Sequence, residues 1–185
     1  MLDSDRTGAL ARLRTLLSEE GGLIATLLEP EQVVLALASS DGESPARLAA
    51  AGPRTERQAA DYELVVEAIY EGYLLHYGAP RVVRIADADL RVLAGDRLYA
   101  IGLARLVELG DTPAVAELAD TITLSALAQG AGERELADAI WTAGARAVGW
   151  GSSEQHRRAK GLVAGGVSEA FEAMRTSAEL SPASP

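Results

Sequence analysis

The chain contains no cysteine among its 185 residues. Disulfides, zinc-thiolate sites and thiol nucleophiles are therefore excluded. Aromatic residues make up only 4% of the chain, so the core has to be built largely from small and unbranched side chains. Such a core favours closely packed helices over a sandwich or a barrel.

Long uncharged apolar runs are also missing. The longest apolar runs that do occur fall far short of the roughly 18 residues that span a bilayer. Residues 1–17 interrupt their apolar positions with Asp and Arg, unlike a signal peptide. We therefore expect a cytoplasmic protein without membrane association. Positive charge is scarce as well, because 17 Lys and Arg face 27 Asp and Glu, for a net charge of −10. Nucleic acid, which needs clustered cations, is not an expected partner.

Helical periodicity runs through the whole chain. The 48% hydrophobic content excludes global disorder. We expect an all-α bundle of about six to eight helices in a single domain over residues 1–180, with a frayed tail at 181–185. The longer predicted helices cover 55–77, 90–110, 112–129, 133–148 and 154–178.

Three polar residues are predicted to cap these helices. Thr55, followed by Gln58, has the spacing of a capping box. Asp87 or Asp89 is expected to cap the helix at Leu90, and two aspartates before a helix are more often caps than cation ligands. Asp111, followed by Pro113, predicts the start of the next helix.

Gly95 and Asp96 stand in the middle of an apolar helix, LRVLAGDRLYAIGLARLVELG. Glycine destabilises a helix interior by roughly 1 kcal/mol relative to alanine, so we expect close helix packing at Gly95. Asp96 is expected beside the buried face, where a carboxylate needs a cation or a donor. Tyr99, one turn further along, is one candidate donor.

Tyrosines gather on the helix before this one. Tyr70, Tyr73 and Tyr77 lie on adjoining faces, and together with Asp96 and Tyr99 they form a candidate binding site for an apolar ligand. The competing interpretation is ordinary packing, with the hydroxyls at the rim of the core.

The final predicted helix carries a candidate partner interface. Val163, Val167, Phe171 and Met174 form an apolar stripe at helical spacing. Such a stripe closes the core of a monomer, docks a partner or lies on a membrane. The last is disfavoured, because interfacial helices need more large apolar residues.

Catalytic signatures are absent from the sequence. His76 and His156 are the two histidines, and no Gly-x-Ser-x-Gly elbow accompanies them. The glycine-rich stretches follow no predicted strand, so they do not form a phosphate-binding loop. We expect no catalytic residues, no metal and no cofactor.

A family resemblance rests on residues 60–132. VLAGDRLYAIGLARLVELGD (92–111), AVAELADTITLSALAQGAG (114–132) and the preceding HYG (76–78) resemble the middle helices of trans-isoprenyl diphosphate (polyprenyl) synthases. The resemblance implies an abbreviated isoprenoid-synthase-like helical bundle. It also implies where two Asp-rich, magnesium-binding motifs of catalytic members belong.

Both of those motifs are missing. The first belongs near residues 64–71, which read LVVEAIYE, and the second belongs beyond residue 132, where no paired aspartates occur. Glu63, Glu67 and Glu71 form a row there that we interpret as a solvated stripe rather than a metal site. The resemblance then implies a non-catalytic relative, such as the small regulatory subunit of heterodimeric polyprenyl synthases. A protein partner or a homo-oligomer is expected; alternatives are a binder of an apolar or prenyl ligand and, disfavoured, a divergent prenyl transferase.

Overall fold

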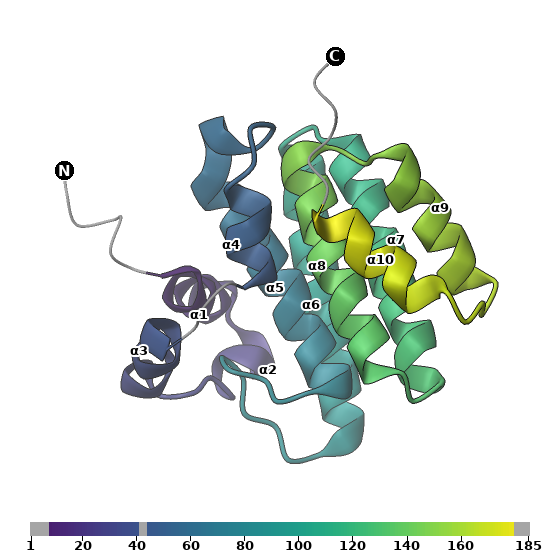
Figure 1. The fold of residues 1–185 in the computed structure, drawn as a ribbon. Helices are drawn as coiled ribbons and strands as arrows, with labels where there is room; N and C mark the ends of the chain where they lie inside the picture. Colours follow the sequence, from purple (N-terminus) through teal and green to yellow (C-terminus); the bar gives the residue numbers. More distant parts are fainter. Residues whose placement is uncertain (1–7, 41–43, 180–185) are drawn as a thin grey trace. The chain divides into compact units, whose positions relative to one another are not determined.

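The computed structural model describes residues 8–40 and 44–179. In these residues the protein is all-helical, with ten α-helices, a single 3-10 turn and no strand (Figure 1). A lone β-bridge joins Leu28 to Val83. The prediction of an all-α helical bundle is confirmed.

Eight of the helices have at least 7 residues. In chain order the helices are α1 (Ala9–Glu20), α2 (Gly22–Ala25), α3 (Glu31–Ser40), α4 (Pro45–Ala50), α5 (Ala59–Tyr77), α6 (Ala88–Glu108), α7 (Thr112–Gly130), α8 (Arg134–Trp150), α9 (Glu154–Ala164) and α10 (Ala170–Glu179).

The helices divide into two compact units. Of the described residues, unit 1 contains 8–40, 44–46 and 60–105, and unit 2 contains 47–59 and 106–179. Two units of this size are compatible with one domain or with two, so the single domain stays a prediction. The predicted tail, 181–185, lies outside the described residues.

The core of unit 1 combines residues from distant parts of the chain. One face of α1, including Leu13 and Leu17, contributes to the same buried cluster as Leu75 of α5 and Leu98 of α6. The segment after α5 closes this core and hydrogen-bonds to residues 27–29. In one of these bonds, Glu29 N–H donates to the Val82 carbonyl over 2.8 Å.

Glycines bring α5 and α6 into close contact. A Cβ placed on Gly95 would lie 3.0 Å from the carbonyl oxygen of Gly72 and 2.5 Å from the His76 ring. A Cβ on Gly102 would collide with the side chain of Ile69. The predicted close packing at Gly95 is confirmed.

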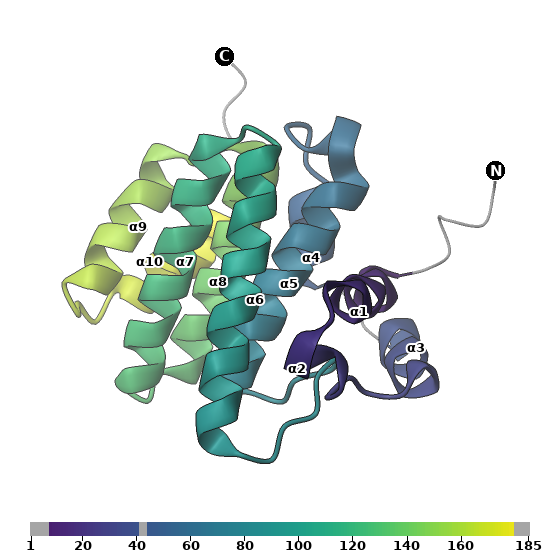
Figure 2. The ribbon, with the colours of Figure 1, turned by 180° about the vertical axis from the view of Figure 1, so that it is seen from behind.

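Helix α8 is the central helix of unit 2. It packs against α7 and α10, and α9 packs against α10 and α7 (Figures 1 and 2). The large side chains of Ile140, Trp141 and Met174 are fully buried here. Gly144 allows the approach of α7, since a Cβ at this position would collide with Thr121.

The predicted caps had mixed outcomes. Leu90 N–H donates to Asp87 over 2.8 Å, and Ala114 N–H donates to Asp111 over 3.1 Å, which confirms both of these caps. The capping box at Thr55 is wrong. Residues 56–58 form the 3-10 turn, and the buried Thr55 hydroxyl instead donates to the carbonyls of Ala49 and Gly52.

The predicted helix over 154–178 is also wrong as a single element. It is interrupted after Ala164, where Gly166 has a φ of +62°, and the chain resumes as α10 at Ala170. Residues with side chains rarely adopt this backbone conformation, so Gly166 permits the turn.

Candidate functional site

The structure brings the predicted ligand-binding residues together in unit 1. The rings of Tyr70 and Tyr73 lie 5.8 Å apart between centroids, and those of Tyr73 and Tyr77 lie 5.4 Å apart. His76, which the sequence did not single out for this cluster, contacts Tyr77 and stacks on Tyr99 at 5.3 Å. The rings therefore contact one another in a continuous series, and ligand binding by them stays a prediction.

Asp96 does not lie beside the buried face, contrary to expectation. Its side chain is 64% exposed, and its Oδ1 lies 3.3 Å from Nε2 of His76. Helix α6 buries a narrow face that includes Ala94, Leu98 and Ile101, whereas Leu93 is exposed. The carboxylate is therefore largely exposed to solvent and is not paired with a buried cation.

Tyr99 lies partly buried at one end of this series of rings. Burial is the largest cause that raises the pKa of its phenol, and the neighbouring Tyr77, Tyr73 and Asp96 raise this pKa further. The hydroxyl is therefore neutral at physiological pH, where it can donate a hydrogen bond but cannot supply a negative charge.

The glutamate row of α5 is not a solvated stripe, which corrects that interpretation. Glu67 and Glu71 are buried, and Arg81 forms ion pairs with both. One oxygen of Glu71 also accepts the backbone N–H groups of Arg81 and Val82, over 2.6 and 2.7 Å. The Arg81 guanidinium lies 5.2 Å from the centroid of the Tyr70 ring.

Burial raises the pKa of the Glu71 carboxyl, while Arg81 and the backbone donors oppose this shift. The arrangement holds the segment after α5 against the helix. These carboxylates stand where the resemblance places the first Asp-rich motif. Both are paired with Arg81, and one Glu71 oxygen also accepts backbone donors. Gly78 and Pro80, which predict a turn between Glu71 and Arg81, are the signal that could have indicated this pairing.

Unit 2 contains a buried polar network centred on His156. Its Nε2 lies 2.7 Å from Glu117, and its Nδ1 lies 3.2 Å from the hydroxyl of Ser177. Lys160 donates to Glu117 over 3.0 Å and to Asp120 over 2.7 Å. Sequence reasoning missed this network, because Glu117 and His156 are 39 positions apart.

The carboxylate, imidazole and hydroxyl have the order of a nucleophilic triad, but their surroundings favour a structural role. The Ser177 hydroxyl donates to the Met174 carbonyl over 2.8 Å. The cavity beside His156 and Ser177 has a volume of about 10 Å³. That is room for about one water molecule and not for an acyl substrate.

The environment of the Glu117 carboxyl leads us to expect that the stability of the fold depends on pH. Burial raises its pKa, but the hydrogen bonds and charges of His156 and Lys160 outweigh burial and lower the pKa below 4.5. A carboxyl with a lowered folded-state pKa stabilises the fold above its unfolded pKa, and this contribution is lost as the pH falls through the folded value.

We therefore expect the free-energy difference between wild type and Glu117→Gln to shrink as the pH falls below about 4.5. Urea denaturation at a series of pH values measures it. A difference that stays undiminished at about pH 3 contradicts this assignment.

The predicted partner interface does not form a single helical face. Val163 of α9 and Met174 of α10 are buried in the core of unit 2. The break between the two helices leaves Val167 and Phe171 exposed, at 40% and 37%. For these two residues, an interface stays a prediction.

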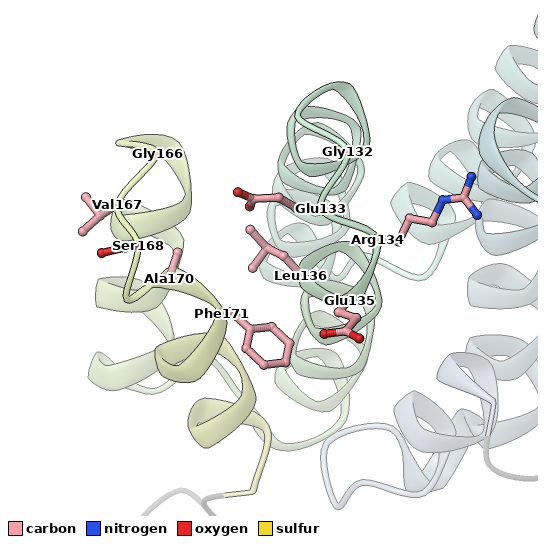
Figure 3. A pocket seen from close by; sticks show the side chains of 10 residues that line it. All are labelled: Gly132, Glu133, Arg134, Glu135, Leu136, Gly166, Val167, Ser168, Ala170 and Phe171. Carbon is pink, nitrogen blue, oxygen red and sulfur yellow. The ribbon is translucent and has the colours of Figure 1, made fainter.

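Val167 and Phe171 line a groove in unit 2 with a volume of about 450 Å³ (Figure 3). One wall is the α7–α8 connection with the start of α8, and the other is the α9–α10 connection with the start of α10. The lining residues are Gly132, Glu133, Arg134, Glu135, Leu136, Gly166, Val167, Ser168, Ala170 and Phe171.

Helix α6 presents a second exposed apolar surface, which we call the α6 face: Leu93, Ala100, Ala104 and Val107. All four residues are exposed, and Leu93 and Val107 are 64% and 60% accessible. Large apolar side chains this exposed are unusual when they recur along one line of a helix.

Within residues 8–40 and 44–179, no three or more His, Asp or Glu side chains gather as a metal site would require. In the same part of the chain, no helix has the length and apolar character needed to cross a bilayer. No family model, curated protein or solved structure matches the chain. The resemblance to polyprenyl synthases therefore stays a prediction from the sequence.

Proposed function

We propose that the protein is a non-catalytic helical subunit that acts by binding a partner, and that this partner is a second copy of the chain. The observation that carries this proposal is the α6 face, an exposed apolar line on the longest helix of the described residues.

The spacing of the α6 face suits a helix partner. Leu93, Ala100 and Val107 recur every seven residues, and seven residues turn an α-helix by about 700°, close to two full turns. Ala104 falls four residues after Ala100 and three before Val107, the spacing of a helix–helix seam, and the equivalent position between Leu93 and Ala100 is Arg97, which forms an ion pair with Glu20. The seam therefore lies along one side of α6.

The order of large and small residues favours a second copy over an unrelated helix. Large Leu93 and Val107 stand seven residues on either side of small Ala100. In an antiparallel pair with its two-fold axis at Ala100, Leu93 of each chain meets Val107 of the other. A symmetric interface needs such a self-complementary surface, and the alanines in the middle permit close approach of the two backbones.

The non-catalytic part of the proposal is supported by the α5 carboxylates. Glu67 and Glu71 stand where the sequence resemblance would place the first Asp-rich motif of a polyprenyl synthase, and both are buried against Arg81. Magnesium requires carboxylate oxygens that are free to complete an octahedral shell. Buried carboxylates that are already paired with a guanidinium are poorly suited to that role.

Sedimentation velocity over a concentration series tests the association. We expect wild type to form a dimer and Val107→Glu to raise the dimer dissociation constant by at least about 100-fold, since the charge would be buried twice in a symmetric interface. Leu127→Glu, an exposed leucine on α7 outside the α6 face, is the matched control and should dimerise as wild type does.

Circular dichroism melting of all three proteins controls for folding, because both replaced side chains are exposed. A wild type that remains monomeric at about 100 μM contradicts the proposal, as does a Val107→Glu variant that dimerises normally.

A further inference from the structure

We infer that the groove between the starts of α8 and α10 binds a small organic cation, a primary amine attached to an apolar body. The inference concerns unit 2 alone and goes beyond the proposed association through α6.

The groove has a suitable size and an apolar wall. Its volume of about 450 Å³ lies within the range of small-molecule sites. Leu136 on the α8 wall and Ala170 on the α10 wall are buried, and the half-exposed ring of Phe171, next to Ala170, lies on the α10 wall (Figure 3). An aromatic or aliphatic body of moderate size can cover Phe171 and Val167, which otherwise face water.

The charge at the groove is negative. Figure 3 shows the Glu133 carboxylate directed into the groove and the Glu135 carboxylate beside Phe171, while the Arg134 side chain extends away. Within residues 8–40 and 44–179, neither glutamate has an ion pair. Burial is the main cause of the raised pKa of Asp138, one turn later in α8, and the negative charge of Glu135 is the second cause.

Helix capping does not account for both carboxylates. Glu133 is the residue before α8, yet its side chain makes no capping hydrogen bond. Glu135 lies in the first turn of α8, where a carboxylate favourably meets the positive end of the helix dipole. Two carboxylates at one end of an apolar groove leave room for an ammonium group, which is the complementary charge.

The aromatic ring strengthens this choice of ligand. A cation within about 6 Å of the centroid of an aromatic ring is attracted by the ring quadrupole. Glu135 and Phe171 line the same groove, so an ammonium group bound there can meet a carboxylate and a ring (Figure 3). The N-termini of α8 and α10, at Arg134 and Ala170, favour an anion instead. An anionic probe is therefore the decisive comparison.

The test uses three probes with the same body: 2-phenylethylamine, 2-phenylethanol and 3-phenylpropionate. Each is titrated into the 15N-labelled full chain, and amide chemical shifts report the site. We expect the amine to perturb residues 132–136 and 166–171 and to bind at least about tenfold more tightly than the alcohol, with no measurable binding of the carboxylate.

Charge removal provides the second arm. Glu133→Gln with Glu135→Gln should weaken amine binding at least about tenfold and abolish the preference over the alcohol. Glu154→Gln removes a comparable first-turn glutamate from α9, outside the groove, and should leave binding unchanged. Phe171→Ala should weaken both the amine and the alcohol.

Several results would overturn the inference. They are equal affinity for amine and alcohol, tighter binding of the carboxylate, shifts confined to other residues, and wild-type affinity in the double glutamine variant. The comparison of probes uses wild-type protein alone, so it remains decisive even if a variant does not fold.

Discussion

Replacement of Arg81 by methionine is expected to lower the free energy of unfolding by about 3–5 kcal/mol, because it leaves two buried carboxylates without their cation. Glu67 and Glu71 are almost inaccessible to water, and Arg81 contacts both. Urea denaturation followed by circular dichroism measures the change.

A nearby arginine supplies the matched control. Arg84 pairs with Glu29 at the surface, where its side chain is largely exposed. Exposed pairs contribute about 0–1 kcal/mol, so Arg84→Met should have a small effect. Adding Glu67→Met and Glu71→Gln to Arg81→Met should restore much of the lost stability, because no buried charge then remains. Equal effects of Arg81→Met and Arg84→Met would show that the buried pairing is wrong.

Replacement of Gly52 by alanine should destabilise unit 2 by roughly 3 kcal/mol. The added Cβ would collide with the backbone of Gly149 near the end of α8. Backbone cannot rotate away as a side chain does, and the Gly149 carbonyl also accepts the Arg54 N–H over 3.0 Å. Relief of the collision therefore requires the segment after α4 to move off α8.

Gly161→Ala is the control for this substitution. Gly161 lies inside α9, and a Cβ there meets no atom within 4 Å. Alanine should stabilise this helix by up to about 1 kcal/mol. The two glycine variants are thus expected to change the midpoint of urea denaturation in opposite directions. A Gly52→Ala variant as stable as wild type contradicts the close approach of Gly52 and Gly149.

Local signals in the sequence were sufficient for much of the secondary structure. Gly78 ends α5, and Asp111 caps α7 as expected. The break at Gly166 was also visible as a glycine pair, but the apolar spacing from Val163 to Met174 continues across it and suggested one helix. Periodicity and breaker residues conflicted there, and the backbone preference of glycine decided the outcome.

The polar clusters were beyond local reasoning. The row of Glu63, Glu67 and Glu71 reads as a surface stripe, because spacing on a helix does not say which face is buried. Arg81, which pairs with Glu67 and Glu71, is brought back against this helix by the turn that follows α5. Similarly, His156 meets Glu117 through the packing of α9 on α7. Tertiary contacts of this kind leave no periodic trace in the sequence.

A single engineered thiol tests the central claim most directly, because the chain has no cysteine. Ala100→Cys places a thiol at the proposed two-fold axis, and Ala119→Cys places one on the exposed side of α7. Disulfides form when two Cα atoms approach to about 4.4–6.8 Å. Under mild oxidation, non-reducing electrophoresis should show a covalent dimer for Ala100→Cys and little for Ala119→Cys. Equal or absent cross-linking of the two variants would contradict association through the α6 face.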